Sequence, residues 1–125
     1  MAGSSKTYTL LKICARLQEL AAAIGDPIPV IRAAPTGVAA FNIIGKTLHS
    51  LLRLPVRGLL LPLAPATLQS LQAGFKHCQF LIIDEKSMIS LKTLSIIDDR
   101  LRSIYPESSH LPFGGLNILL CGDFF

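Results

Sequence analysis

The first residues of the chain that could do chemistry are Lys6 and Thr7, which follow the small residues Gly3, Ser4 and Ser5. Small residues let backbone N–H groups close around phosphate oxygens, a lysine reaches the terminal phosphates, and a threonine hydroxyl can bind Mg²⁺. The positive end of a following helix adds to the attraction for an anion. One departure is Ser5, which stands where a glycine normally precedes the lysine. A small-residue cap before an ordinary helix, the commoner arrangement, would look the same.

A pair of carboxylates, Asp84 and Glu85, follows the continuous apolar run at residues 80–83. An aspartate at the end of a buried strand can hold Mg²⁺ through its water shell, and a neighbouring glutamate can orient or deprotonate an attacking water. Acidic residues are common at strand ends, so the pair alone does not specify this chemistry. Its combination with Lys6, about 78 positions upstream in a chain of alternating strands and helices, favours nucleotide hydrolysis.

Three further groups have both a functional and a structural interpretation. Asp123 follows the third predicted strand and could sense the same nucleotide, but a turn aspartate is preferred for that residue alone. Pro35, Thr36 and Gly37 join a strand end to a helix start, where exposed backbone can bind phosphate of a nucleotide or of DNA. Thr36 more simply caps the helix. His49 could contact a nucleic-acid backbone, although a lone histidine is more often structural.

The 125 residues fit one globular domain. Half of them are hydrophobic and 16% are charged, which excludes intrinsic disorder and collagen-like or low-complexity classes. Apolar stretches stay shorter than the about 18 residues of a membrane-spanning helix, so we expect no membrane partner. Residues 1–62 hold seven Lys and Arg against two acids, and residues 63–125 hold five against six. A basic first half hints at an anionic partner such as phosphate or nucleic acid, although ordinary solvated charge explains it equally well.

The cysteines and histidines do not form a site of their own. The three cysteines are widely spaced and include no CxxC pair, and the three histidines do not cluster with them. We therefore expect neither a zinc site nor a disulfide framework, and a reducing compartment. The first residues lack the unbroken apolar core of a secretory signal, so we do not expect secretion.

The elements that must position these groups begin with a helix of regularly spaced apolar residues. This helix is predicted to begin near Lys6 or Thr7, after the small run, and to end at Gly25. Short strands are predicted at residues 30–34, 80–83 and 117–121, the last two of them buried. Shorter helices are predicted at residues 38–43, 48–52 and 66–73, with an irregular connection at residues 55–65.

One glycine and one proline are predicted to end the later helices. Gly74 is predicted to stop the helix at residues 66–73, and Pro106 to end a second long helix that begins near residue 91. The predicted buried face of the long helix comprises Leu91, Leu94, Ile97, Leu101 and Ile104. The charged residues Asp98, Arg100 and Arg102 are predicted to lie largely off that face.

The alternation of strands and helices predicts an α/β fold. Strands joined by helices form right-handed crossovers and hence a parallel sheet. In such sheets ligands bind beyond the carboxyl ends of the strands, where Thr36, Asp84, Glu85 and Asp123 are expected. The central prediction is that the ammonium of Lys6 and the carboxylates of Asp84 and Glu85 share one pocket at this edge.

Four segments, in this order, resemble one family of proteins. They are Gly3-Ser4-Ser5-Lys6-Thr7, Ala34-Pro35-Thr36-Gly37-Val38-Ala39-Ala40-Phe41-Asn42 with Thr47-Leu48-His49-Ser50, Leu81-Ile82-Ile83-Asp84-Glu85-Lys86-Ser87-Met88-Ile89, and Phe113-Gly114-Gly115 with Cys121-Gly122-Asp123-Phe124-Phe125. They are similar to segments of the Pif-type DNA helicases of superfamily one, including relatives carried by Helitron-type mobile elements. Asp98, Arg100 and Arg102 also resemble the family's signature stretch between its second and third nucleotide motifs.

The resemblance implies a P-loop NTPase of the RecA-like type, with a parallel sheet flanked by helices. The implied activity is ATP-driven unwinding of DNA, with five-prime to three-prime movement on single-stranded DNA, in repair, recombination and telomere maintenance. The implied partners are single-stranded and forked DNA, and the implied cofactors are ATP and Mg²⁺. It implies that Lys6 and Glu85 are catalytic and that Thr7 and Asp84 bind the metal. The implied nucleotide ligands are Gly3, Ser4, Ser5, Lys6, Thr7, Asp84, Glu85 and Asp123, and the implied DNA contacts are Pro35, Thr36, Gly37 and His49.

Four departures from the family pattern shape these expectations. The family has a strand before its phosphate loop, a glutamine after its Gly-Asp-Phe segment and a second RecA-like lobe with an arginine finger, and Ser5 here replaces a glycine. We therefore expect residues 1–125 to be a partial RecA-like helicase domain, without the N-terminal strand and second lobe, and inactive alone. The alternative is a non-catalytic helicase remnant with weak nucleotide or DNA binding. A small P-loop kinase fits these residues less well. We expect the protein in the nucleus or in the mitochondrion.

Overall fold

Four short strands form one parallel sheet in the computed structural model, which describes residues 2–25, 29–56 and 59–122, with side chains from residue 6 onward. The strands are β1 (Val30–Ala34), β2 (Lys46–Thr47), β3 (Phe80–Ile83) and β4 (Asn117–Leu120). They are hydrogen-bonded in the order β2-β1-β3-β4, and each neighbouring pair is parallel. The predicted parallel sheet is confirmed, with β2 as an addition, because a two-residue strand is too short to show a pattern.

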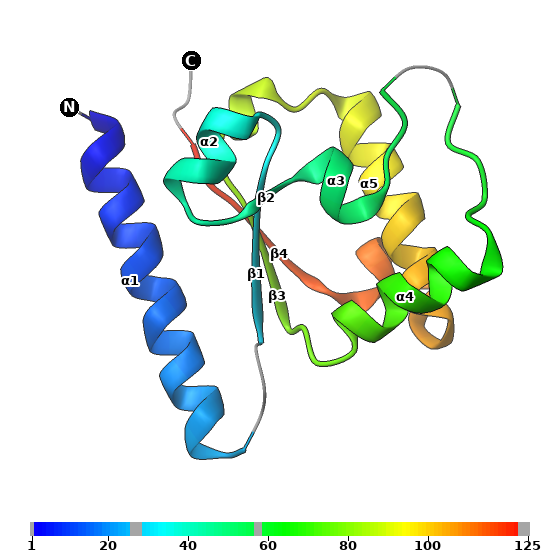
Figure 1. Cartoon of the computed structure of the whole chain (residues 1–125), viewed down its shortest axis with the longest axis horizontal. Helices are drawn as coiled ribbons and strands as arrows, with labels where there is room; N and C mark the ends of the chain where they lie inside the picture. The colour runs from blue at the N-terminus through cyan, green and yellow to red at the C-terminus, as the bar shows by residue number, and fades with distance from the viewer. Residues whose placement is uncertain (1, 26–28, 57–58, 123–125) are drawn as a thin grey trace.

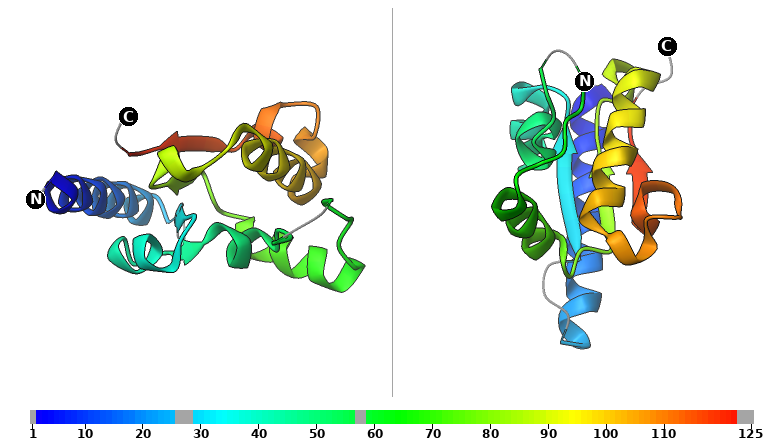
Figure 2. Two further views of the ribbon diagram at one scale, coloured as in Figure 1. Left: turned by 90° about the horizontal axis from the view of Figure 1, so that it is seen from above. Right: turned by 90° about the vertical axis from the view of Figure 1, so that its right-hand side faces the viewer.

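Helices cover both faces of this sheet (Figure 1). On one face lie α1 (Ala2–Ala23) and α2 (Gly37–Asn42), and on the other α3 (Leu48–Leu52), α4 (Pro65–Phe75) and α5 (Leu91–Ile104). Seen from above, α1 and α5 lie on opposite sides of the strands (Figure 2). Short 3₁₀ turns follow β3 at Lys86–Met88 and precede β4 at Pro106–Ser108 and Pro112–Gly115.

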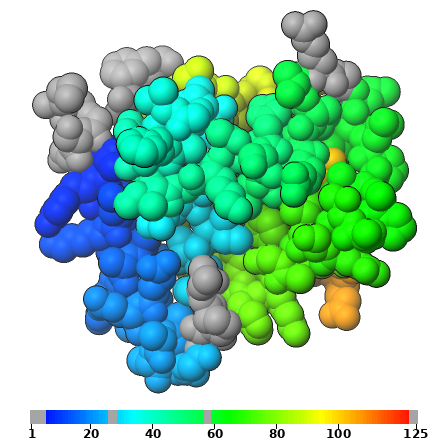
Figure 3. Space-filling model, in the orientation of Figure 1, coloured from blue at the N-terminus to red at the C-terminus, as the bar shows by residue number. Residues whose placement is uncertain are grey.

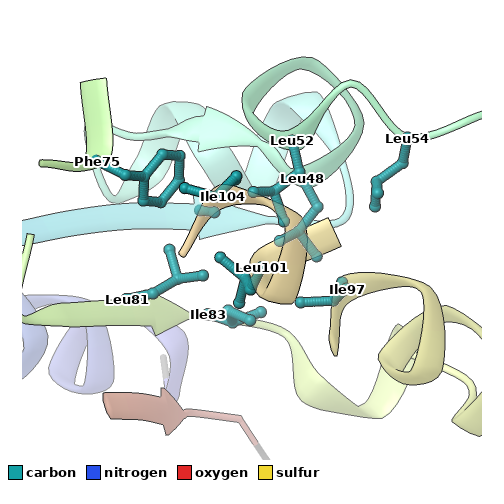
Figure 4. Packing of buried hydrophobic residues seen from close by; sticks show 10 residues of the cluster. Leu48, Leu52, Leu54, Phe75, Leu81, Ile83, Ile97, Leu101 and Ile104 are labelled. Carbon is teal, nitrogen blue, oxygen red and sulfur yellow. The ribbon is translucent and has the colours of Figure 1, made fainter. Parts of the chain in front are cut away.

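The two central strands are buried on both faces, as predicted for β3. Leu81 and Ile83 of β3 point into the larger core, where they meet Leu48 of α3 and Leu101 of α5 (Figure 4). Ile82 points the other way, into a smaller core with residues of α1 and α2. This alternation follows from the two-residue period of a strand, and it fixes the side chains that follow each strand relative to the two helical layers.

β4 differs from the prediction of a buried strand. Leu119 and Leu120 are each 41% exposed, and Asn117 is also exposed. Within the described residues β4 pairs only with β3, so its other edge and part of both faces lie open. An apolar run is equally compatible with a covered or an open strand, so the sequence did not reveal the difference.

Two helix boundaries also differ from the predictions. α1 begins at Ala2, so Gly3–Ser5 lie within its first turn instead of forming a loop before it. Each residue added to an existing helix gains a backbone hydrogen bond, and a single glycine costs only about 1 kcal/mol. Gly74 does not stop α4, because the helix continues to Phe75, whose buried ring packs edge to face against Tyr105.

The buried face of α5 is only partly the predicted one. Ile97, Leu101 and Ile104 are buried, but Leu91 at the start of the helix is exposed. Arg100, predicted to lie off this face, is buried together with Leu101. A buried guanidinium is tolerated here because it donates three hydrogen bonds to backbone carbonyls that lie 39 to 48 residues earlier.

Candidate functional site

The carboxyl ends of the parallel strands meet at one edge of the sheet. β1 runs into Pro35 and Thr36, and β3 runs into Asp84 and Glu85. The first turns of α1 and the end of β4 lie at the same end of the molecule (Figure 1). This arrangement places polar residues from distant parts of the sequence around one edge, as the strand-end rule predicts.

Lys6, Asp84 and Glu85 form the centre of this site. Lys6 Nζ lies 2.9 Å from Asp84 Oδ1 and 3.7 Å from Glu85 Oε1. The Asp84 side chain is 4% exposed, whereas those of Lys6 and Glu85 are 25% and 38% exposed. The predicted convergence of the ammonium and both carboxylates at one edge of the sheet is confirmed.

Asp84 is fixed by the sheet but is incompletely hydrogen-bonded. Its backbone N–H donates to the carbonyl of Ala33 at 3.0 Å, which continues the pairing of β1 with β3 beyond the end of β3. Its buried Oδ1 accepts no well-aligned hydrogen bond within the described part of the chain, although the Lys6 ammonium lies beside it. Buried carboxylate oxygens normally have aligned donors or a bound cation, so this atom marks a place where a ligand would complete the site.

Glu85 adopts an unusual backbone conformation. Its φ of 59° and ψ of 45° lie in the left-handed region, which costs a residue with a side chain about 1 kcal/mol. The turn is held by two hydrogen bonds to the end of β4, from Lys86 N to the Cys121 carbonyl at 3.0 Å and from Cys121 N to the Ile83 carbonyl at 2.8 Å. Such strain is typical of functional sites, and here it accompanies the placement of the Glu85 carboxylate beside Lys6.

The predicted phosphate loop is not a loop in this structure. The backbone of Gly3–Ser5 is helical, and the side chains of these residues lie outside the described part. The first N–H groups of a helix have no carbonyl partner within it, so this end of α1 still offers donors to an anion. Thr7, directly after Lys6, is partly buried.

The segment from Pro35 to Gly37 lies at the end of β1, where α2 begins. Thr36 caps α2, because its Oγ1 accepts a hydrogen bond from Ala39 N at 3.2 Å. The capping interpretation of Thr36 is therefore confirmed. Gly37, the first residue of α2, is exposed, which leaves the start of this helix open to a ligand.

His49 lies on α3, beyond the end of β2. Thr47 caps this helix through a hydrogen bond from Ser50 N to its Oγ1 at 3.2 Å. Both His49 and Ser50 are exposed, so His49 is not a core histidine. A role of Pro35, Thr36, Gly37 and His49 in DNA binding stays a prediction.

The thiol of Cys121 belongs to the electrostatics of the site, although the sequence analysis did not single it out. Burial raises its pKa most, and the negative charge of Asp84 raises it further, while Lys6 and Lys86 lower it. Cys14 also contributes a raising effect. The signal was present in the sequence, because Cys121 is the last residue of a predicted strand and therefore lies at the strand-end edge that also carries Asp84.

Asp123, predicted to sense the nucleotide, lies outside the described residues. Among residues that are described, no group of three or more His, Cys, Asp and Glu is placed to hold a metal ion. The same part of the chain has no helix that is both long enough and apolar enough to cross a membrane.

Comparisons with known proteins agree with this geometry. The family model described as PIF1-like helicase matches residues 1–125. The human ATP-dependent DNA helicase PIF1 is 32% identical over 125 residues, which cover 98% of this chain and 18% of the relative. The chain thus spans about a fifth of the length of this relative.

Solved structures show the same fold. The crystal structure of Pif1 helicase from Bacteroides in complex with ADP-AlF3 and ssDNA matches 98% of this chain and 27% of that chain, with a TM-score of 0.69 and 36% identity. The crystal structure of Pif1 helicase from Candida albicans matches 99% of this chain and 27% of that chain, with a TM-score of 0.71 and 29% identity. Sequence, fold and the convergence of Lys6 with Asp84 and Glu85 agree, and the chain belongs to the PIF1-like helicase family.

Proposed function

We propose that this chain forms the ATP site of a DNA helicase, in which Lys6 binds the phosphates, Asp84 holds Mg²⁺ and Glu85 activates the attacking water. The observation that carries the proposal is the approach of Lys6 Nζ to Asp84 Oδ1 and Glu85 Oε1. Family membership supports it, because the human relative is an ATP-dependent DNA helicase and the Bacteroides relative was solved with ADP-AlF3 and ssDNA.

The donor set at the site suits Mg²⁺. This ion takes oxygen ligands and usually uses one or two protein residues together with substrate phosphates and waters. Asp84 offers a buried carboxylate oxygen without an aligned hydrogen bond, and Thr7 offers a hydroxyl beside Lys6 on α1. We assign these two residues to the ion, which when bound would neutralise charge that develops on the phosphates.

Lys6 and Glu85 would act on the nucleotide and the water. The ammonium of Lys6 now lies between two carboxylates, and phosphate oxygens would compete with these carboxylates for it. Both side chains are partly exposed, so they can meet a ligand without disturbing the core. Glu85, released from the lysine, would accept a proton from the attacking water.

The DNA path in this proposal follows the starts of α2 and α3. Pro35, Thr36, Gly37 and His49 lie there, at the edge that also carries Lys6 and Asp84, and the first half of the chain is basic. We propose single-stranded and forked DNA as the partner, five-prime to three-prime unwinding as the activity, and repair, recombination and telomere maintenance as its settings. If nucleotide and DNA bind at the same edge of the sheet, the binding of one could change the affinity for the other.

The experiment that tests the nucleotide site is a thermal shift with Mg-ATP. Occupancy at about 100 times the dissociation constant stabilises a protein by about 2.7 kcal/mol, which corresponds to a rise of several degrees in Tm. We expect this rise in the unmodified chain and its loss in Lys6→Ala. Because Lys6→Ala also changes basal stability, the ligand-induced shift is the quantity to compare.

Lys12→Ala is the matched control. Lys12 lies on the same helix, is exposed, and has its ammonium 5.5 Å from the centre of the Tyr8 ring. It should keep the full Mg-ATP shift. No shift in the unmodified chain, or equal shifts in Lys6→Ala and Lys12→Ala, would contradict the proposed site.

A non-catalytic role in nucleotide or DNA binding is the second candidate. The helical backbone of Gly3–Ser5 favours it, because a closed phosphate loop is not formed. Release of inorganic phosphate from ATP separates the two candidates. A Mg-ATP shift without phosphate release, with and without single-stranded DNA, would favour binding alone.

A further inference from the structure

A second cleft lies along the side of β1, apart from the Lys6–Asp84 site. Its volume is about 1060 Å³, and its lining includes the first three residues of β1, Val30, Ile31 and Arg32. Helices from both layers of the fold contribute to its lining. Figure 3 views the molecule from the side on which β1 and β2 lie toward the reader, between α1, α2 and α4.

The backbone edge of β1 is only partly covered in this cleft. β2 pairs with Ala33 and Ala34 alone, while β3 pairs with residues 30–33 on the opposite edge of β1. Within the described residues, no strand residue is the register partner of residues 30–32 on the side of the cleft, but Gly45 lies close against the Arg32 carbonyl. The open part of this edge is therefore the backbone of Val30 and the N–H group of Arg32. An edge of this kind offers both N–H donors and carbonyl acceptors to an added strand.

The walls of the cleft are partly apolar. Phe41, 82% exposed, and Ile44, 70% exposed, form one rim near α2, and the partly buried Leu71 of α4 contributes on the other side. Large exposed apolar side chains beside a groove are typical of a protein interaction surface. Successive side chains of an extended peptide point to opposite sides, so a strand added beside β1 would meet both walls.

The charge of the cleft has one sign. Arg32, Lys46 and Arg53 are its only ionisable lining residues, and none of the lining residues is acidic. Cations in a concave surface with apolar walls attract and concentrate anionic partners. A polyanion without backbone amides would satisfy the cations but would leave the N–H and carbonyl groups of the β1 edge without matching partners.

We propose that this cleft binds an extended acidic peptide of a partner protein, which adds as a strand along residues 30–32 of β1. Main-chain hydrogen bonds to β1 provide affinity, and the apolar walls hold alternate side chains. Arg32, Lys46 and Arg53 select for acidic residues. This proposal is independent of the nucleotide site and of its residues.

The test uses a fluorescein-labelled octapeptide that alternates valine and glutamate, with binding followed by fluorescence polarisation. We expect it to bind the 125-residue chain, whereas the same peptide with lysine in place of glutamate does not. A version with N-methyl groups on alternate amides keeps the charge but cannot form the strand hydrogen bonds, so it should also fail to bind. Binding should slow amide exchange at Val30 and Arg32.

Charge variants test the cleft itself. In Lys46→Glu with Arg53→Asn we expect about tenfold weaker peptide binding, since exposed ion pairs contribute up to about 1 kcal/mol each. Asparagine suits position 53, whose φ is 55°. Lys92→Glu with Lys12→Asn changes net charge equally at two exposed positions outside the cleft and should leave binding unchanged.

Several outcomes would overturn the proposal. Equal binding of the glutamate and N-methylated peptides would show that no strand is added. Equal losses in the two charge variants would show that only net charge matters. A labelled oligo-dT that displaces the peptide, and whose own binding is lost in Lys46→Glu with Arg53→Asn, would assign the cleft to nucleic acid instead. The peptide comparisons use the unmodified chain, so they decide the matter even where a variant does not fold.

Discussion

Two charged side chains are buried in the described part of the chain, and they are satisfied in opposite ways. Arg100 donates from Nε to the Leu52 carbonyl at 3.0 Å, from Nη2 to the Arg53 carbonyl at 2.9 Å and from Nη1 to the Leu61 carbonyl at 3.3 Å. Asp84 Oδ1 has no aligned hydrogen bond there and depends on the charge of Lys6 at 2.9 Å.

The difference separates a structural charge from a functional one. Buried charges are costly unless they are compensated, and backbone carbonyls compensate Arg100 permanently by joining α5 to the end of α3 and to the segment after it. The charge that compensates Asp84 comes from a partly exposed side chain, which a ligand can attract away. Incomplete hydrogen bonding at Asp84 thus leaves room for a ligand, whereas all three nitrogens of the Arg100 guanidinium already donate to backbone carbonyls.

The largest effect should follow from Arg100→Met, which removes the guanidinium and leaves an unbranched apolar side chain in its place. The buried carbonyl of Leu52 and the partly buried carbonyls of Arg53 and Leu61 lose their donors, so we expect the free energy of unfolding to fall by about 3 kcal/mol. Urea unfolding followed by circular dichroism measures this. Lys92→Met, on an exposed face of the same helix, should change stability by about 0.5 kcal/mol at most. Similar losses of unfolding free energy in both variants would contradict a structural role of the Arg100 hydrogen bonds.

A smaller effect on stability is expected from Asp84→Asn, which removes the buried charge and keeps the shape. The partly exposed Lys6 ammonium can be solvated, so unfolding free energy should change by about 1 kcal/mol or less. The Mg-ATP shift in Tm should nevertheless be lost. Glu107→Gln, an exposed acid after α5, is the control and should keep the shift. A full shift in Asp84→Asn would remove Asp84 from the site.

The position of Asp84 could be predicted from the sequence, whereas the burial of Arg100 could not, and the reason is physical. Asp84 directly follows an apolar run, and the strand-end rule places every such residue at one edge, so its meeting with Lys6 was predictable. The partners of Arg100 are backbone carbonyls 39 to 48 residues away, one of them in an irregular segment. Carbonyl groups carry no sequence signal, so only the structure shows that a charged residue on an amphipathic helix is buried.

Two other differences arose where local patterns depend on surroundings. The apolar run of β4 was predicted to be buried, but burial depends on what covers the strand. Gly3–Ser5 were predicted to form a loop, yet small residues without proline also continue a helix. In both places the residue types allow two structures, and tertiary contacts outside the segment decide between them.

A third prediction concerns Cys78, which packs against the core cluster that contains Leu101, the residue after Arg100. Burial raises the pKa of its thiol to about 11, and its Sγ donates to the Phe80 carbonyl at 3.4 Å. A raised pKa in the folded state stabilises the protein below the unfolded pKa near 9, and this contribution is lost as pH rises through about 11. The urea concentration at the midpoint of unfolding should therefore decrease as the pH is raised from 9 to 11. The decrease should be less steep in Cys78→Ala. Equal slopes would show that Cys78 does not titrate with folding.

The smallest effect should occur at Cys121, whose titration reports the charges of the Lys6–Asp84 site. The negative charge of Asp84 raises the pKa of this thiol, and Lys6 lowers it, so the two variants should shift it in opposite directions. Alkylation by iodoacetamide, followed by mass spectrometry of the Cys121 peptide across a pH series, gives the midpoint. It should move to lower pH in Asp84→Asn and to higher pH in Lys6→Ala. Cys78 in the same samples provides the internal control, because burial alone raises its pKa and neither variant should move it. Unchanged or parallel shifts at Cys121 would mean that the charges of Lys6 and Asp84 do not act on the end of β4 as the structure places them.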